Sequence, residues 1–161
     1  MSSLKCSVDI ETVSSKSENF HLLATSEERV PIAKRLNLLS LDHLEATLHL
    51  VKKGHLELSG KITADVTQKC VRTLVPFSQH FEIEVAEVFT HMPEETQEEI
   101  ELEAEVLTEP LYDTTLDLGE VVIQLLSLTL DPYPVAPESG PVDYKEDNSS
   151  SSPFAVLKKE E

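Results

Sequence analysis

Two segments decide the fold of this 161-residue sequence: His43-Leu-Glu-Ala-Thr-Leu-His-Leu50 and Leu56-Glu-Leu-Ser-Gly-Lys-Ile-Thr-Ala-Asp-Val66. In both, apolar and polar side chains alternate with a period of two, which is the pattern of a β-strand with one buried and one solvent-exposed face. Gly54 lies between the segments, next to Lys52 and Lys53. The sequence therefore predicts two antiparallel strands joined by a short turn near Gly54.

Shorter segments predict further elements. Strands are expected at residues 4–13, 81–85 and 100–106, the last with a glutamate at every second position. Two helices are expected to start at Thr25-Ser-Glu-Glu28 and at Asp117-Leu-Gly-Glu120, because each places an acid three residues after an N-cap residue and apolar residues follow at helical intervals.

These elements predict an α+β domain over residues 1–136, with an antiparallel sheet of five or six strands and two principal helices against one face. Asp131-Pro-Tyr-Pro134 ends the second helix, because proline does not continue it. Residues 137–152 are rich in Pro, Ser, Asp and Glu and predict a flexible linker. Residues 153–161 carry Phe154 and Leu157 and are interpreted as a short docking segment, which would bind either this chain's own sheet or the groove of a partner.

The charge of the chain is distributed unevenly. The formal net charge is −17, and no Lys or Arg occurs between Arg72 and Lys145, a stretch that contains seventeen Asp and Glu residues. Such a field attracts cationic partners and repels nucleic acid, so we expect a basic partner and no binding to DNA. The candidates for contact with RNA phosphates are the hairpin residues Lys52, Lys53, Lys61 and Lys69, although lysines there also keep a strand soluble.

No motif indicates an enzyme. The four glycines, at positions 54, 60, 119 and 140, form neither a P-loop nor a dinucleotide-binding turn. His43 and His49 fall on the polar side of a strand and are interpreted as solvated, and Cys6 and Cys70 as buried free thiols. We expect no catalytic residue, cofactor or bound metal. No apolar run is long enough to cross a membrane and no secretory signal is recognised, so a cytoplasmic protein without a membrane partner is expected.

Three blocks of the sequence resemble a known family. Gly60-Lys-Ile-Thr-Ala-Asp-Val-Thr-Gln-Lys-Cys-Val-Arg-Thr-Leu-Val-Pro76 resembles the central motif of the YceD family, the large ribosomal RNA subunit accumulation proteins (domain of unknown function 177). The segment from Asp117 to the Asp131-Pro-Tyr-Pro134 sequence resembles the second block of the family, and Pro153-Phe-Ala-Val-Leu157 resembles its C-terminal Phe-x-x-Leu signature. The resemblance spans most of residues 1–159.

The residue at position 73 refines this resemblance. Thr73 points to the alphaproteobacterial branch of the family. Many members have a second cysteine at this position, so no metal-binding or redox role is transferred to Cys70.

The resemblance implies a role in accumulation of large-subunit ribosomal RNA and in ribosome biogenesis, without an established catalytic activity. The motif residues that it nominates for interaction are Gly60, Gln68, Cys70, Arg72, Leu74, Pro76, Asp117, Gly119, Glu120, Asp131, Pro132, Tyr133, Pro134, Phe154 and Leu157. The favoured hypothesis is a non-enzymatic factor that binds a basic ribosomal protein or assembly factor and approaches precursor large-subunit rRNA. The alternatives are an acidic escort chaperone for one basic ribosomal protein, without RNA contact, and a metal-dependent nuclease built on the carboxylates.

Overall fold

The computed structural model describes residues 4, 6–13, 17–91, 109–111 and 113–140. Within these residues the elements follow in the order β1 (Ser7–Asp9), β2 (Glu18–Leu23), α1 (Ser26–Arg35), β3 (Ser40–Lys52), β4 (Leu56–Lys69), β5 (Pro76–His91), β6 (Glu109–Leu111), β7 (Thr115–Asp117) and α2 (Leu118–Thr129).

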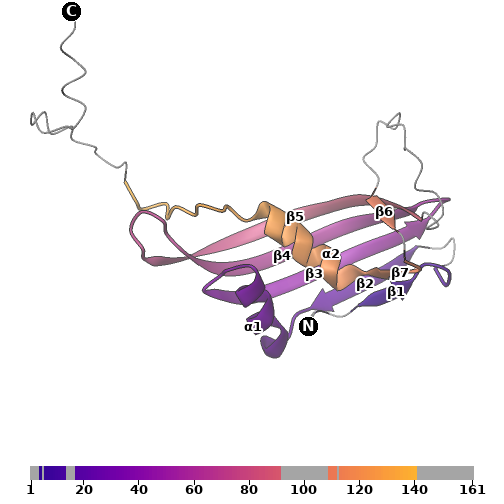
Figure 1. Cartoon of the computed structure of the whole chain (residues 1–161), viewed down its shortest axis with the longest axis horizontal. Helices are drawn as coiled ribbons and strands as arrows, with labels where there is room; N and C mark the ends of the chain where they lie inside the picture. Colours follow the sequence, from indigo (N-terminus) through magenta and orange to yellow (C-terminus); the bar gives the residue numbers. More distant parts are fainter. Residues whose placement is uncertain (1–3, 5, 14–16, 92–108, 112, 141–161) are drawn as a thin grey trace, which may run out of the picture.

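The main sheet is built around the predicted hairpin. β3 and β4 pair antiparallel along almost their whole length, from Lys52 opposite Leu56 to Ser40 opposite Thr67. The strand order is β2-β3-β4-β5-β6, and all neighbours are antiparallel except β5 and β6, which are parallel (Figure 1). β1 and β7 form a separate two-stranded antiparallel sheet. The predicted α+β class and the mainly antiparallel sheet of five or six strands are therefore confirmed.

One face of the sheet is buried and the other faces water, as the alternation predicts. In β3 and β4 the residues of the apolar set are almost completely buried, whereas His49 and Lys61, of the polar set, are exposed. α2 crosses the buried face diagonally (Figure 1). The largest fully buried side chains of β3, β4 and α2 belong to one apolar layer: Leu44, Leu48, Leu50, Leu58, Ile62, Val66, Leu118, Val122, Ile123 and Leu126. Each such side chain contributes about 1.5–3 kcal/mol when removed from water, so this layer is the main source of stability.

Both helices begin where the capping residues predict. The hydroxyl of Thr25 accepts from the N–H of Glu28 (3.4 Å), and the carboxylate of Glu28 accepts from the N–H of Thr25 (2.8 Å), which completes a capping box. Asp117 Oδ1 accepts from the N–H groups of Gly119 (3.0 Å) and Glu120 (3.2 Å). These bonds satisfy main-chain donors that have no partner inside the helix.

Some expected elements differ from the structure or lie outside its described part. Of the strand expected at residues 4–13, only β1 is formed, because Asp9 Oδ1 accepts from the N–H of Glu11 (2.9 Å) and turns the chain. β2 was not predicted. The expected strand at 100–106, the docking segment 153–161 and the linker beyond residue 140 lie outside the described residues. Both cysteines are free, as predicted, but Cys6 is only partly buried.

Candidate interaction surface at the β4–β5 turn

The connection between β4 and β5 is a compact turn at one end of the sheet. The N–H of Cys70 donates to the carbonyl of Val75 (3.0 Å), and the N–H of Leu74 donates to the carbonyl of Cys70 (2.9 Å). Leu74 has a φ of 61°, in the left-handed region, which costs an L-residue about 1–2 kcal/mol. Its side chain is exposed, so burial of Leu74 does not offset this cost.

The sulfur of Cys70 accepts hydrogen bonds inside this end of the domain. The side chain is fully buried, and the main-chain nitrogens of Ala136 and Thr73 lie 3.4 and 3.5 Å from Sγ. These donors, Ala136 above all, lower the pKa of the Cys70 thiol to about 6, whereas its burial acts in the opposite direction. Cys70 therefore ties the turn to the segment that follows α2.

The segment after α2 lies along the turn. Asp131 Oδ1 accepts from the N–H of Tyr133 (2.8 Å), which bends the chain directly after the helix. The N–H of Val71 donates to the carbonyl of Pro134 (2.9 Å), and Arg72 Nη1 donates to the carbonyl of Gly140 (3.3 Å). Two of the three motif blocks recognised in the sequence therefore meet at this end of the sheet.

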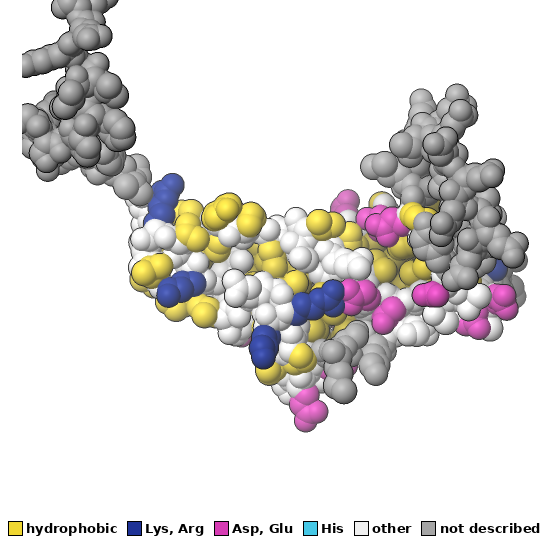
Figure 2. Space-filling view, viewed as in Figure 1, with side chains coloured by type: hydrophobic (Ala, Val, Ile, Leu, Met, Phe, Trp, Pro, Cys, Tyr) yellow, Lys and Arg dark blue, Asp and Glu magenta, His cyan; other side chains and the backbone are white. Residues whose placement is uncertain are grey.

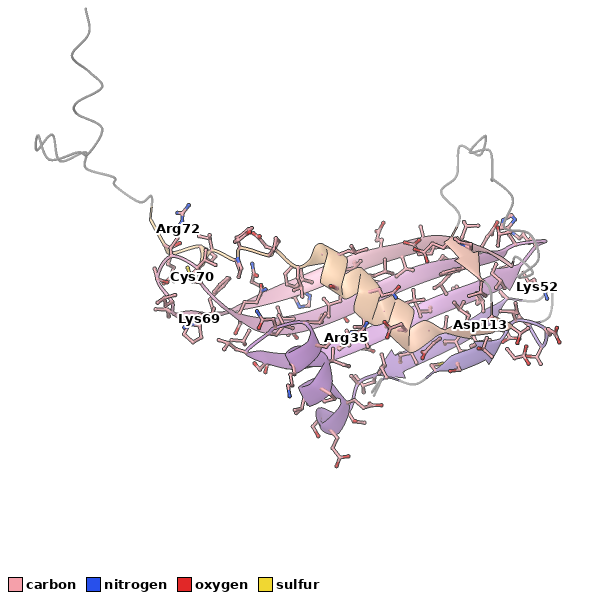
Figure 3. All side chains as sticks on the ribbon, in the orientation of Figure 1. Arg35, Lys52, Lys69, Cys70, Arg72 and Asp113 are labelled. Carbon is pink, nitrogen blue, oxygen red and sulfur yellow. The ribbon has the colours of Figure 1, made fainter. Side chains whose placement is uncertain are left out.

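Apolar side chains are exposed where these blocks meet. The exposed fractions are 48% for Val71, 62% for Leu74, 57% for Val75 and 74% for Tyr133. Lys69 and Arg72 lie at the same end (Figure 3). Cationic and apolar side chains gather there, whereas the acidic side chains in this view lie mainly toward the opposite end (Figure 2). We call this set of residues the turn surface; it consists of Lys69, Val71, Arg72, Leu74, Val75 and Tyr133.

Two open cavities flank the turn surface. One, of about 400 Å³, is lined by Gln68 and Lys69 of β4 and by Leu130 and Pro132 after α2. The other, of about 490 Å³, lies between the start of β5, which begins at Pro76, and residues 136–139. Exposed apolar groups beside recesses, with charged groups around them, are typical of a surface that binds another macromolecule.

Gln68 stands between the turn surface and the core. It is only 7% exposed, and its Oε1 has no hydrogen-bond partner among the described residues. An acceptor left unpaired in a buried position costs about 1–3 kcal/mol. Gln68 is therefore a polar side chain at the inner wall of the first cavity, and not an exposed contact residue.

The two motif glycines have structural roles away from the turn surface. Gly60 has a φ of +154°, and a Cβ at this position would overlap the main-chain oxygen of Thr47 on β3. A Cβ on Gly119 would overlap the carbonyl oxygen of Leu4, which lies against the start of α2. Both positions therefore require glycine for close packing of the main chain.

Glu120 joins the two helices. Its carboxylate accepts from Nη1 (2.8 Å) and Nη2 (2.5 Å) of Arg35 on α1. The Arg35 guanidinium lowers the pKa of Glu120, first through these hydrogen bonds and further through its charge. Asp117 caps the same helix, so both motif acids at the start of α2 act in the fold.

The four lysines predicted as RNA-facing do not form one patch. Lys52 Nζ donates to the carbonyl of Ile10 (2.8 Å), and Lys53 and Lys61 form ion pairs with glutamates at 3.4 and 3.0 Å. Lys52 and Lys69 lie at opposite ends of the sheet (Figure 3). A strand of 14 residues such as β4 spans about 45 Å. Only Lys69 belongs to the turn surface.

The polar face of the sheet carries histidines paired with carboxylates. His43 lies 3.3 Å from Glu45, and His80 Nδ1 lies 2.6 Å from Asp65, which raises the pKa of His80. His49 is exposed and His43 partly buried, which agrees with the prediction of solvated strand residues. In the described parts of the chain, no group of three His, Cys, Asp or Glu side chains is placed to hold a metal ion.

Val71 and Val75 were missing from the predicted site. In this turn, only the residues of the family motif could be nominated from the sequence. The available signal was the cluster of apolar residues between two predicted strands, in a connection where polar residues are usual. Phe154 and Leu157, which were nominated, lie outside the described residues.

The hairpin, its turn and the helix that crosses the sheet define the class as an α+β protein, with a group of exposed apolar side chains at one end of the sheet. The sequence matches the family described as large ribosomal RNA subunit accumulation protein YceD over residues 58–161, and the chain belongs to this family. Membership implies a role in accumulation of large-subunit ribosomal RNA. No curated protein and no solved structure matches the chain. None of the helices in the described ranges has the length and apolar character needed to span a bilayer.

Proposed function

We propose that this chain supports accumulation of large-subunit rRNA and ribosome biogenesis in the cytoplasm without catalysing a reaction, by binding an assembly partner through the turn surface. The observation that carries the proposal is the exposure of Val71, Leu74 and Val75 on a turn held by main-chain hydrogen bonds, together with the exposure of Tyr133 on the segment that is bonded to this turn. Water is an unfavourable environment for such a group of side chains, and burial against a partner is worth about 25 cal/mol per Å².

The proposed partner is a basic ribosomal protein or assembly factor. The net charge of −17 favours a cationic protein through long-range attraction. The turn surface supplies the short-range apolar contact, and its rigidity reduces the entropy lost on binding, because the hydrogen bonds of Cys70 and Val71 already fix the main chain.

A second candidate is direct contact with precursor large-subunit rRNA at the same end of the molecule. Lys69 and Arg72 lie at this end of the sheet (Figure 3), and the exposed Tyr133 directly precedes Pro134, whose carbonyl accepts from the N–H of Val71. Cations neutralise phosphates and an aromatic ring stacks on an unpaired base, which is a common arrangement in RNA-binding proteins. The strongly negative net charge opposes this contact at long range, so the protein partner is preferred.

Two alternatives from other classes make different predictions. An acidic escort would bind one basic ribosomal protein and no RNA, and a metal-dependent nuclease would retain a divalent ion and cleave RNA.

Assignment to the alphaproteobacterial branch, which rests on Thr73 alone, also stays a proposal.

The test is sedimentation of tagged protein from gently lysed cells through a sucrose gradient, with rRNA and proteins identified in each fraction. The turn variant is Val71→Ser with Leu74→Ser. The matched control is Leu23→Ser with Val30→Ser, which changes side chains that are 55% and 69% exposed on β2 and α1. We expect the wild type and the control to migrate with a precursor of the large subunit, and the turn variant to stay at the top.

Other outcomes decide between the candidates. A turn variant that still migrates with the precursor contradicts the proposed surface. Wild-type protein at the top of the gradient with one basic polypeptide supports the escort. Variants Lys69→Ala and Arg72→Ala that lose rRNA but keep the protein partner support direct RNA contact, and they should also reduce the salt dependence of binding.

A further inference from the structure

β5 has a long edge without a strand partner in the described part of the chain. The strand is 16 residues long, but β6 pairs only with residues 89–91. β5 therefore forms the rim of the sheet, with β6 at one end of it (Figure 1). An edge strand presents a row of main-chain N–H and C=O groups that pairs readily with another extended chain.

The side chains of this edge are incompletely covered. Phe81 and Ile83 lie on the buried face but are only partly buried. Their partners on β4, Ala64 and Ile62, are 0% exposed. One further strand beside β5 would cover the outer flanks of Phe81 and Ile83, and so add apolar burial to the main-chain hydrogen bonds.

The other face of the same edge is acidic. Glu82 and Glu84 alternate with Phe81 and Ile83 and are exposed on the polar face, and Glu82 also forms an ion pair with Lys61 of the inner neighbour β4 (3.0 Å). A carboxylate directly opposite a like charge on a neighbouring strand is destabilising, whereas an opposite charge is favourable. The edge therefore selects an incoming strand by its charge.

This charge disfavours two of the available occupants. A second copy of β5 would place glutamates near glutamates. The segment 92–108 of the same chain contains seven glutamates and no Lys or Arg, so it is disfavoured in the same way. A strand that alternates basic and apolar residues is complementary on both faces.

We propose that the outer edge of β5, over residues 78–86, binds an extended basic segment of a partner protein as an additional strand. Its Lys or Arg side chains lie beside Glu82 and Glu84, and its alternate apolar side chains cover Phe81 and Ile83. The inference deepens the proposed function, on which it rests for the identity of the partner as a component of ribosome assembly. The edge itself is a different surface from the turn surface.

The test uses the full chain and a synthetic peptide with the sequence (Lys-Val)₄, labelled for fluorescence anisotropy. The edge variant is Glu82→Lys with Glu84→Lys. The control is Glu11→Lys with Glu27→Lys, and both pairs change the net charge from −17 to −13, since each reversal adds two charges. We expect the edge variant to bind the peptide at least about tenfold more weakly than the control, with a stronger effect at low salt.

Two further measurements identify the mode of binding. A peptide N-methylated at every second residue on its pairing edge should not bind, because it cannot donate the main-chain hydrogen bonds. Hydrogen exchange should slow at alternate amides between residues 78 and 86 when the unmodified peptide is added, since every second N–H of an edge strand points outward.

Three results would contradict the binding of a partner strand at the β5 edge. Equal affinities of the edge and control variants would overturn the proposal. Outward amides of 78–86 that are already protected in the monomer mean that the chain itself covers the edge. Protection that rises with protein concentration means that a second copy does. A failure of peptide binding leaves the sedimentation test of the turn surface unaffected, so the two proposals fail separately.

Discussion

Replacing Leu74 by glycine separates the stability of the turn from its binding. Leu74 has a φ of 61° and is 62% exposed. Relief of the left-handed strain raises the free energy of unfolding by about 1–2 kcal/mol. Two effects of the substitution lower it again: the greater chain entropy of glycine in the unfolded state, about 0.5–1 kcal/mol, and the loss of the buried part of the leucine side chain, about 0.5–1 kcal/mol. The free energy of unfolding should therefore change by less than about 1 kcal/mol, which shifts Tm by no more than about 2–4 °C.

The effect of Leu74→Gly on partner binding should be much larger. If a partner covers the exposed part of the side chain, its loss removes about 1–2 kcal/mol of apolar burial, which corresponds to about 5- to 30-fold weaker binding. Tm is measured by circular dichroism, and binding by recovery of the large-subunit precursor with the tagged protein. Leu74→Met is the control, because it keeps an apolar side chain and should retain binding.

Two results would refute this reasoning. A fall in Tm of more than about 5 °C for Leu74→Gly would mean that Leu74 contributes to the fold more than its exposure indicates. Unchanged recovery of the precursor, with unchanged Tm, would mean that no partner covers Leu74.

Three further predictions concern residues that hold the fold. Gly60→Ala should lower the free energy of unfolding by about 3 kcal/mol in denaturant titrations, because its Cβ would overlap main-chain atoms. Gly140→Ala is the control and should be almost neutral, because nothing lies within 4 Å of its Cβ. Equal effects of the two substitutions would contradict the packing argument. Glu120→Gln should lower Tm at pH 7 by about 2 °C. Arg35 lowers the pKa of Glu120 in the folded state, so the stability that this pair contributes is fully present above the unfolded pKa of about 4.5. It is lost as the pH falls through the lower pKa of the folded state, and below that value the Tm of the variant should equal the Tm of the wild type. A difference in Tm that persists in acid would mean that the Arg35–Glu120 ion pair is not its cause. Cys70→Ala should lower the free energy of unfolding by about 2 kcal/mol and speed up hydrogen exchange at residues 131–140, because two main-chain donors lose their acceptor. Cys70→Ser keeps an acceptor and should retain most of the protection from exchange.

The fold was predictable where the determining interactions are local. The hairpin of β3 and β4 follows from alternation over consecutive residues, and the helix starts follow from caps that act within four residues. β2 was missed because Phe20 and Leu22 are its only partly buried apolar residues, and two residues do not define a period. The strand expected at 4–13 was too long because Asp9 turns the chain, which alternation does not reveal.

The candidate site was predictable only in part, because it depends on contacts between distant segments. Cys70, Arg72 and Leu74 were nominated from the family motif, but the pairing of Val71 with Pro134 that joins the two blocks has no local signature. The four lysines nominated for contact with RNA do not lie together, since Lys52 at the end of β3 and Lys69 at the end of β4 stand at opposite ends of the sheet.

The order of the strands has a consequence for how the protein is made. β2, β3, β4 and β5 are neighbours in the sheet in the same order as in the chain, so each strand can pair with its predecessor soon after it leaves the ribosome. The core closes much later, because α2 follows β7 and Val8 of β1 pairs with Leu116. Until then the nascent sheet exposes its apolar face, and such intermediates aggregate readily. Translation that stalls before residue 118 would therefore leave a paired but unprotected sheet, which a chaperone would have to shield.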